Sequence, residues 1–247
     1  MSDKNKFVKL DNWVKELIVD PLSKEPMSLS QKEDLLLSPY GSVYPVANGI
    51  YDLRLLKSAT TSDVILWEKG QKEYENSSIN WSEYDNQDFF GELAGVEEVY
   101  REITITGRCL DVGGHQGRLR AFLSPGQEYL SCDPFISVFD SISKSKKLVV
   151  AYPFLMEPVN FICCQAEHLP FRSSSFDTVH MRSVIDHFMN PELALKEAFR
   201  VMAKDGQLVV GLYVRGGKSG LESFSEKSKE AVKNILPYFG CHKWEDH

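Results

Sequence analysis

The sequence predicts an α/β protein with a doubly wound, mostly parallel sheet and a small β-hairpin module before it. Two observations carry this prediction. Between residues 108 and 214, short apolar runs alternate with helical patterns, and this alternation is typical of a parallel sheet covered by helices. Between residues 13 and 56, short β-prone runs alternate with Pro, Gly and Asn, which are signals for hairpins.

The composition places the chain among ordinary folded domains. Its 247 residues are 43% hydrophobic and 26% charged, which argues against wholesale disorder. The net charge of -7 argues against a protein that holds nucleic acid by general electrostatics. No stretch approaches the roughly 20 apolar residues that span a bilayer, and the first six residues lead into no apolar signal core. We therefore expect a cytoplasmic protein without a membrane segment.

The cysteines predict neither a disulfide framework nor a metal site. Four of the five fall inside apolar runs, where a buried, reduced thiol acts as a small hydrophobe, and no C-x-x-C pair exists. The five are Cys109, Cys132, Cys163, Cys164 and Cys241.

Three regions follow one another along the chain. The N-terminal module, residues 1–57, holds β-prone runs at 17–19, 39–41 and 43–50. Residues 58–105 are polar and rich in Trp, Tyr, Asn and Glu, with helical patterns near 63–76 and 91–102. We interpret them as a connecting, lid-like segment before the main domain, residues 106–247.

The main domain supplies the alternating elements. We expect strands at 109–112, 129–132, 161–164, 178–181 and 207–214, with a helix fragment at 119–123. A helix over 191–202 precedes the last strand and ends at the stop signal Lys204-Asp205-Gly206. Ligands of such sheets bind outside the carboxyl ends of the strands, so the loops after strands are the candidate site.

The first of these loops is rich in glycine. Residues 111–117 read DVGGHQG. Glycine there allows a sharp turn and a close approach of backbone to a ligand, with free N–H groups on the following helix. A simple tight turn and a dinucleotide site are the alternatives, but His115 and Arg120 stand where the spacing G-x-G-x-x-G for NAD requires glycine. Asp133 ends the next strand and is placed to accept bonds from two ribose hydroxyls, which favours an adenosine cofactor without choosing one.

Residues 108–123 resemble the first motif of the class I S-adenosylmethionine-dependent methyltransferases of the type 11 kind. In that family an aspartate precedes a glycine loop that holds the amino acid end of the cofactor. Asp111, Gly113 and Gly117 match, whereas His115 stands where the family most often has glycine. The resemblance implies a Rossmann-like fold, S-adenosylmethionine as cofactor, and cofactor contacts by the residues of the first two loops, namely Asp111, Gly113, Gly114, His115, Gly117, Asp133 and Pro134.

Three further motifs follow in the family's order, so that the resemblance covers roughly residues 108–214. Residues 164–177 resemble the adenine-contacting loop, to which Gln165, Ala166 and Glu167 would belong. The family usually has an acidic residue at Gln165, whose carbonyl oxygen can still accept a bond from the adenine amino group. Residues 182–188 and 198–208 match the segment after the fourth strand and the helix-turn-strand signature.

The resemblance implies in-line transfer of a methyl group, in which positioning and exclusion of water do much of the catalysis and no metal is required. For an alcohol acceptor a general base would help, and His187 is the weak candidate, with a packed structural histidine as the alternative. Arg182 is a candidate contact for the cofactor carboxylate or an acidic substrate, and a surface salt bridge is its alternative role.

The N-terminal module resembles the zinc ribbon that precedes the catalytic domain in some rRNA guanine methyltransferases. Asp20 and Ser23 occupy its first C-x-x-C, and no cysteine precedes Cys109, so a thiolate site cannot form there. We predict a zinc-free β-hairpin unit. Because the module lacks the zinc-binding cysteines and the net charge is acidic, we favour a small molecule or a glycan intermediate as the methyl acceptor. Structured RNA or protein is the next class.

The end of the chain predicts either a sheet without its last two strands or a truncated sequence. The family's closing β-hairpin would follow the helix expected at about 221–238, yet only six residues remain after Cys241. Its absence would expose the edge of the strand 207–214 and favour pairing with a second copy of the chain. The alternative classes are a non-catalytic regulatory protein that keeps the fold, and an NAD-dependent oxidoreductase, which the glycine spacing disfavours.

Overall fold

The computed structural model describes residues 5–55, 62–81 and 88–211. Its centre is a parallel sheet with the strand order β10-β9-β6-β7-β8. These strands are β6 (Cys109–Val112), β7 (Tyr129–Asp133), β8 (Val159–Cys163), β9 (Phe176–Arg182) and β10 (Met202–Gly211). The fold class predicted from the sequence, a mostly parallel sheet with an N-terminal hairpin segment, is confirmed.

The N-terminal residues extend this sheet beyond β8. Their elements are β1 (Val8–Lys9), α1 (Asn12–Leu17), β2 (Ser28–Leu29), β3 (Leu35–Leu37), β4 (Val43–Ala47) and β5 (Ile50–Asp52). Both β1 and β5 pair in parallel with β8, and β4, β3 and β2 continue from β5 as antiparallel strands. Asn48 and Gly49, with φ angles of 53° and 84°, form the tight turn between β4 and β5, as expected for an Asn-Gly hairpin.

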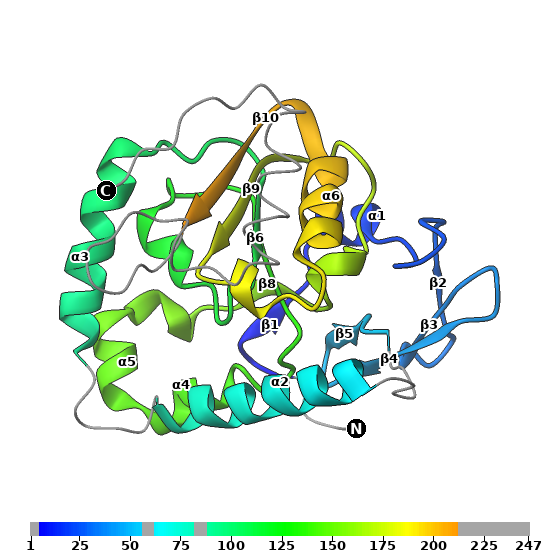
Figure 1. Ribbon diagram of the computed structural model, residues 1–247, viewed down its shortest axis with the longest axis horizontal. Helices are drawn as coiled ribbons and strands as arrows, with labels where there is room; N and C mark the ends of the chain where they lie inside the picture. Colours follow the sequence, from blue (N-terminus) through cyan, green and yellow to red (C-terminus); the bar gives the residue numbers. More distant parts are fainter. Residues whose placement is uncertain (1–4, 56–61, 82–87, 212–247) are drawn as a thin grey trace.

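The two faces of the sheet hold two separate apolar cores. Leu110, Leu130 and Ile162 point to one face, where α1 and α6 (Pro191–Val201) cover them. Their neighbours Cys109, Tyr129 and Phe161 point to the other face, beneath α3 (Phe89–Glu102), α4 (Asp140–Lys144) and α5 (Lys146–Ala151). Figure 1 shows these two groups of helices on opposite sides of the strands. Strands buried on both faces explain the continuous apolar runs in the sequence.

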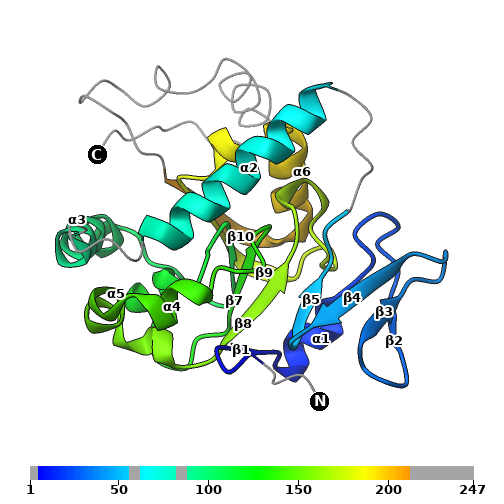
Figure 2. The same ribbon diagram turned by 90° about the horizontal axis from the view of Figure 1, so that it is seen from below.

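Helix α2 (Ser62–Trp81) lies across the carboxyl ends of the strands (Figure 2). Trp67 and Gln71 donate from their side chains to the backbone oxygen of His187, which follows β9. Four residues further along, the Glu75 carboxylate accepts bonds from the backbone N–H and the hydroxyl of Ser137, which follows β7. Residues four apart share a helix face, so one face of α2 bridges two of the loops that form the candidate site.

In the N-terminal module the run predicted as β-prone at 17–19 is not a strand, because Leu17 ends α1 and Ile18 and Val19 form only isolated bridges. In the main domain the structure differs from the predicted elements in two places. Residues 140–156 contain two short helices and the 3₁₀ helix η2 (Pro153–Met156), none of which the sequence pattern revealed. The helix predicted over 191–202 ends at Val201, because Met202 already pairs with Phe176 as the first residue of β10. The expected stop at 204–206 lies in the irregular stretch between Met202 and Gln207. The predicted strand residues 212–214 and the predicted helix 221–238 lie outside the described residues.

Candidate functional site

The loops after four neighbouring strands meet at one end of the sheet and carry most of the predicted site residues. The glycine loop follows β6, Asp133 ends β7, and Gln165 and Glu167 follow β8 at the 3₁₀ helix η3 (Ala166–His168). A 3₁₀ helix after β9, η4 (Ile185–His187), completes the group. Parallel strands end at the same edge, so residues far apart in the sequence come together here.

The glycine loop leaves no room for side chains at two positions. A Cβ on Gly113, whose φ angle is 72°, would lie 2.3 Å from Val184 Cγ1. A Cβ on Gly114 would lie 2.5 Å from Asp111 Cγ and 2.6 Å from Ser131 Oγ. Gly117, with a φ angle of 83°, opens the 3₁₀ helix η1 (Arg118–Phe122). Here glycine is required by close packing and by left-handed backbone.

His115 stands in the loop with a left-handed φ angle of 49°, a backbone conformation that glycine adopts more readily than other residues. Its backbone N–H donates to Asp133 Oδ2 over 3.3 Å, and its backbone oxygen accepts from Ser131 Oγ. Burial lowers the pKa of the imidazole to about 4, and the positive charge of Arg118 adds to this effect. The ring is therefore neutral at physiological pH and packs edge-on against Phe135.

Asp133 is a buried carboxylate at the carboxyl end of β7. Its two oxygens accept from the backbone N–H groups of Phe135 and His115. Burial, together with the neighbouring carboxylates of Glu75 and Asp111, raises the pKa of Asp133 to about 7 in spite of these two hydrogen bonds. The charged form of such a buried carboxylate is stabilised when hydroxyl groups of a ligand donate hydrogen bonds to it.

The N-terminal hairpin reaches this site through Arg54. Its guanidinium forms two bonds to the Asp52 carboxylate at the end of β5, the longer of 2.8 Å, and one of 3.1 Å to the backbone oxygen of Pro134. The predicted site residue Pro134 is therefore fixed by the segment that precedes the main domain in sequence.

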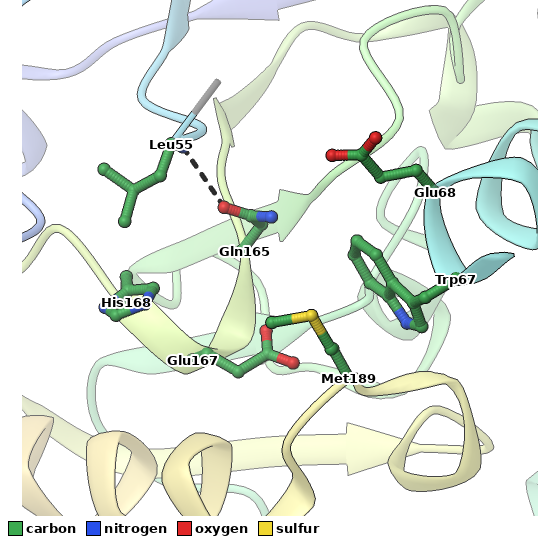
Figure 3. Close-up of a pocket in the computed structure, with 7 residues that line it drawn as sticks. All are labelled: Leu55, Trp67, Glu68, Gln165, Glu167, His168 and Met189. Carbon is green, nitrogen blue, oxygen red and sulfur yellow. Dashed lines mark hydrogen bonds between the residues drawn. The ribbon is translucent and has the colours of Figure 1, made fainter. Parts of the chain in front are cut away.

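A pocket lies between α2 and the loop after β8 (Figure 3). It encloses about 320 Å³ including its open mouth. Trp67 and Glu68 lie on one side and Leu55 and His168 on the other, with Gln165 between them. The other lining residues are Glu167 and Met189. Two of the three residues predicted to contact adenine thus line one cavity, and the third, Ala166, is buried next to them.

Two polar side chains of this pocket, Gln165 and Glu167, accept hydrogen bonds from backbone N–H groups. Gln165 Oε1, which we expected to accept from adenine, accepts from the backbone N–H of Leu55 over 3.1 Å. Glu167 Oε1 accepts from the backbone N–H of Asn190. Both side chains are therefore fixed before a ligand enters, and a carbonyl oxygen has a second lone pair for a further donor.

Arg182 and His187 do not line this pocket. Arg182 Nη2 is 3.6 Å from the Glu92 carboxylate on α3, which also pairs with Arg118 at 3.2 Å. His187 lies beneath α2, and its Nε2 is 3.9 Å from Asp186 Oδ2. The side chains of Arg182 and His187 are each about one third exposed.

Sequence reasoning missed several residues of the site. Trp67 and Leu55 line the pocket but come from segments whose position no sequence pattern could fix. His180 and Tyr129 both bind Asp111. The available signal for this pair was a polar side chain inside each of two buried strands.

The Asp20 carboxylate is the centre of the N-terminal module. One oxygen accepts from the backbone N–H groups of Leu22 and Ser23, and the other accepts from the Tyr44 hydroxyl. This aspartate stands at the first zinc-ligand position of the resembled ribbon. Within the described residues no group of three or more His, Cys, Asp or Glu side chains is arranged to hold a metal ion.

Comparison with known proteins identifies the main domain. Residues 110–210 match the family model described as a methyltransferase domain. An uncharacterized methyltransferase, YcgJ of Bacillus subtilis, is 29% identical over 49% of this chain and 46% of its own. A mitochondrial 2-methoxy-6-polyprenyl-1,4-benzoquinol methylase of Caenorhabditis elegans is 26% identical over 47% and 44%. The ubiquinone/menaquinone biosynthesis C-methyltransferase UbiE of Agrobacterium fabrum is 24% identical over 47% and 49%.

Among solved structures, YcgJ of Bacillus matches with a TM-score of 0.37 at 29% identity, over 47% of this chain and 48% of its own. The [4+2]-cyclase SpnF matches with a TM-score of 0.45 at 17% identity, over 73% and 74%. The chain spans about half the length of the curated relatives it matches.

The family match and the sheet order together define the class. Residues 110–210 form a methyltransferase domain of the Rossmann-like class that uses S-adenosylmethionine. The predicted fold is thereby confirmed, and the matched domain is of the predicted methyltransferase class, whose cofactor is the predicted one. No helix among the described residues is long and apolar enough to cross a membrane.

Proposed function

We propose that the protein transfers the methyl group of S-adenosylmethionine to a small molecule or a glycan intermediate. One observation carries the proposal most directly: the crowded glycine loop and the buried Asp133 carboxylate lie side by side, joined by the bond from His115 to Asp133. This pair of features fits an amino acid next to a ribose. Two relatives are a benzoquinol methylase and a quinone-pathway C-methyltransferase by name, which favours the small-molecule class over RNA or protein.

Three parts of the site would bind three parts of the cofactor. The loop from Asp111 to Gly117 would hold the amino acid end, and Asp133 would accept the ribose hydroxyls. The pocket with Gln165 and Glu167 would receive the adenine, with the Trp67 ring along its wall. When bound, the cofactor supplies an electrophilic methyl group on a sulfonium, which requires no covalent enzyme intermediate.

The contribution of the chain is then orientation and exclusion of water. Helix α2 covers the site through its bonds to His187 and Ser137. His187 is our candidate base for an acceptor hydroxyl, because its partly exposed imidazole follows β9 at the same edge of the sheet. Arg182 is our candidate contact for a carboxylate, and binding there would compete with Glu92 for the guanidinium.

Calorimetry with S-adenosylmethionine and S-adenosylhomocysteine tests the cofactor assignment on the whole protein. We expect both to bind, and the variant Asp133→Ala to bind at least about tenfold more weakly, since it loses hydrogen bonds to a charged group. Exposed Asp34→Ala is the matched control. Absence of binding of either ligand at millimolar concentration would overturn the proposal.

Transfer of a labelled methyl group distinguishes the acceptor classes. The protein is incubated with labelled S-adenosylmethionine and, in separate reactions, with a panel of substituted hydroquinones, oligosaccharides, bulk RNA or denatured protein. We expect label in a small-molecule fraction. Label in RNA or protein alone would refute the acceptor class, and cofactor binding without any transfer would favour a regulatory role.

A further inference from the structure

A row of buried polar side chains crosses three neighbouring strands on the α3 face of the sheet. Asp111 on β6 is paired in register with His180 on β9, and Tyr129 on β7 lies on the same face as Asp111, because Cys109 and Tyr129 are register partners and side chains alternate. All three side chains are at least about nine-tenths buried. A buried polar row within an apolar core is costly unless every member is bonded.

Every member of this row is bonded. Tyr129 donates its hydroxyl to Asp111 Oδ2 over 2.5 Å, and His180 Nδ1 lies 2.7 Å from Asp111 Oδ1. A carboxylate only accepts, so His180 Nδ1 carries the proton in this bond. In the Nδ1–H tautomer Nε2 is an acceptor, and the Tyr100 hydroxyl, 2.5 Å away, donates to it.

Tyr100, which lies on α3, connects this helix to the polar row through its bond to His180. The same helix carries Glu92, which pairs with Arg118 immediately after the glycine loop. Helix α3 is therefore connected to the loop at two points, once through Glu92 and once through Tyr100, His180 and Asp111. Nothing in the proposed methyl transfer itself requires these contacts.

The position of the Asp111 carboxylate matters because it packs against the glycine loop. A Cβ on Gly114 would lie within 2.5 Å of both the Asp111 Cγ and an Asp111 carboxylate oxygen. The loop backbone thus follows the surface of this carboxylate, and a rotation of the carboxylate would move it into Gly114 or away from it. His180 and Tyr129 hold the carboxylate from two sides and prevent that rotation.

We propose that His180 is a positioning residue that fixes Asp111, and with it the glycine loop, and that Tyr100 links this fixation to the placement of α3. The proposal rests on the proposed function, since the loop is taken as the cofactor cradle. It assigns His180 no contact with the cofactor.

Two conservative variants separate the roles of the two ring nitrogens. An asparagine amide can place its N–H₂ near the position of Nδ1, and a glutamine amide can place its own near Nε2. We expect His180→Asn to keep the affinity for S-adenosylhomocysteine within about threefold and His180→Gln to lower it by about tenfold or more. A side chain that only fills space would make the two variants equal, and that result would overturn the proposal.

Tyr100→Phe tests the link to α3 without touching Asp111, and exposed Tyr40→Phe is its matched control. We expect Tyr100→Phe to weaken binding by about threefold to tenfold and Tyr40→Phe to leave it unchanged. Equal affinity in both would refute the role of Tyr100. These two variants keep the test valid if the His180 variants do not fold.

The imidazole nitrogen resonances of the ligand-free protein test the arrangement without any cofactor. We expect the Nδ1–H form of His180, whereas the Nε2–H form would overturn the assignment. Failure of the unmodified protein to bind S-adenosylhomocysteine would instead refute the proposed function, and the two failures are thereby distinguishable.

Discussion

The indole N–H of Trp67 donates to the backbone oxygen of His187 across 3.0 Å. This bond joins the helix over the site to the loop after β9, and the same indole lines the pocket of Gln165 and Glu167. The occupancy of the pocket and the environment of one tryptophan are therefore coupled.

Binding of S-adenosylhomocysteine should change the tryptophan emission of the protein. The change should disappear in Trp67→Phe, because the other described tryptophan with a known partner, Trp13, stacks with Arg108 away from the pocket. Fluorescence titration measures this, with Trp13→Phe as control. A full signal retained in Trp67→Phe would place the ligand elsewhere.

Gly114→Ala should abolish measurable cofactor binding and destabilise the protein by about 1–3 kcal/mol, because its Cβ would overlap Asp111 and Ser131. Gly95→Ala is the control: it lies in α3 with open space around its Cβ, and alanine in a helix should raise stability by about 1 kcal/mol. Chemical denaturation and calorimetry measure both effects. A Gly114→Ala protein with full affinity would contradict the tight loop.

Cofactor affinity should rise with pH between 6 and 8. The pKa of Asp133 is about 7 in the free protein, and ribose hydroxyls donate best to its ionised form, so binding releases a proton below that pH. The affinity should fall by up to about tenfold for each pH unit below 7. His115 stays neutral across this range because its pKa is about 4.

Calorimetry at pH 6, 7 and 8 measures this dependence. Asp133→Asn should bind weakly and show no slope near pH 7. A slope that survives in the variant would assign the titration to another group.

Asp20→Ala should lower the free energy of unfolding by about 2 kcal/mol or more, since it leaves the buried Tyr44 hydroxyl without its acceptor. Tyr44→Phe, which removes one of the four bonds that the Asp20 carboxylate accepts, should cost about 1 kcal/mol. Burial alone would raise the pKa of Asp20, but its hydrogen bonds from Ser23, Leu22, Ser38 and Tyr44 outweigh burial and lower it.

The stabilisation by Asp20 is therefore complete above the unfolded pKa of about 3.9 and is lost as the pH falls through the lower folded value. Urea denaturation between pH 3 and 7 should show this loss in the unmodified protein and less of it in Asp20→Ala. Stoichiometric zinc in the purified protein would show instead that the N-terminal module is held by metal.

The sequence pattern predicted the strands well because each is an apolar run between turn signals, and it predicted the glycine loop because its residues are contiguous. It could not predict that Gln165 accepts from Leu55, since that bond joins residues 110 positions apart. The same limit hid the position of Trp67 over the pocket. Local patterns contain no information on such pairings.

The short helices after Asp140 were missed for a different reason. Each has five or six residues, too few for a helical period to emerge. The polar row of Tyr129, Asp111 and His180 was in principle readable from alternation, because a buried strand that carries a histidine and an aspartate requires partners for both. Its connection to Tyr100 depended on the placement of α3.

The pairing of β1 and β5 with β8 has a consequence for the order of folding. Val8 pairs with Val159 and Tyr51 with Ile162, so each partner is synthesised long after the residue that needs it. At about 5–20 residues per second on the ribosome, the N-terminal strands wait on the order of 10 s for their neighbour to emerge. Such distant pairings raise the contact order and slow folding. These N-terminal strands are thus completed only after β8 has been made, and Ile50, which is buried in the folded protein, lacks part of its covering until then.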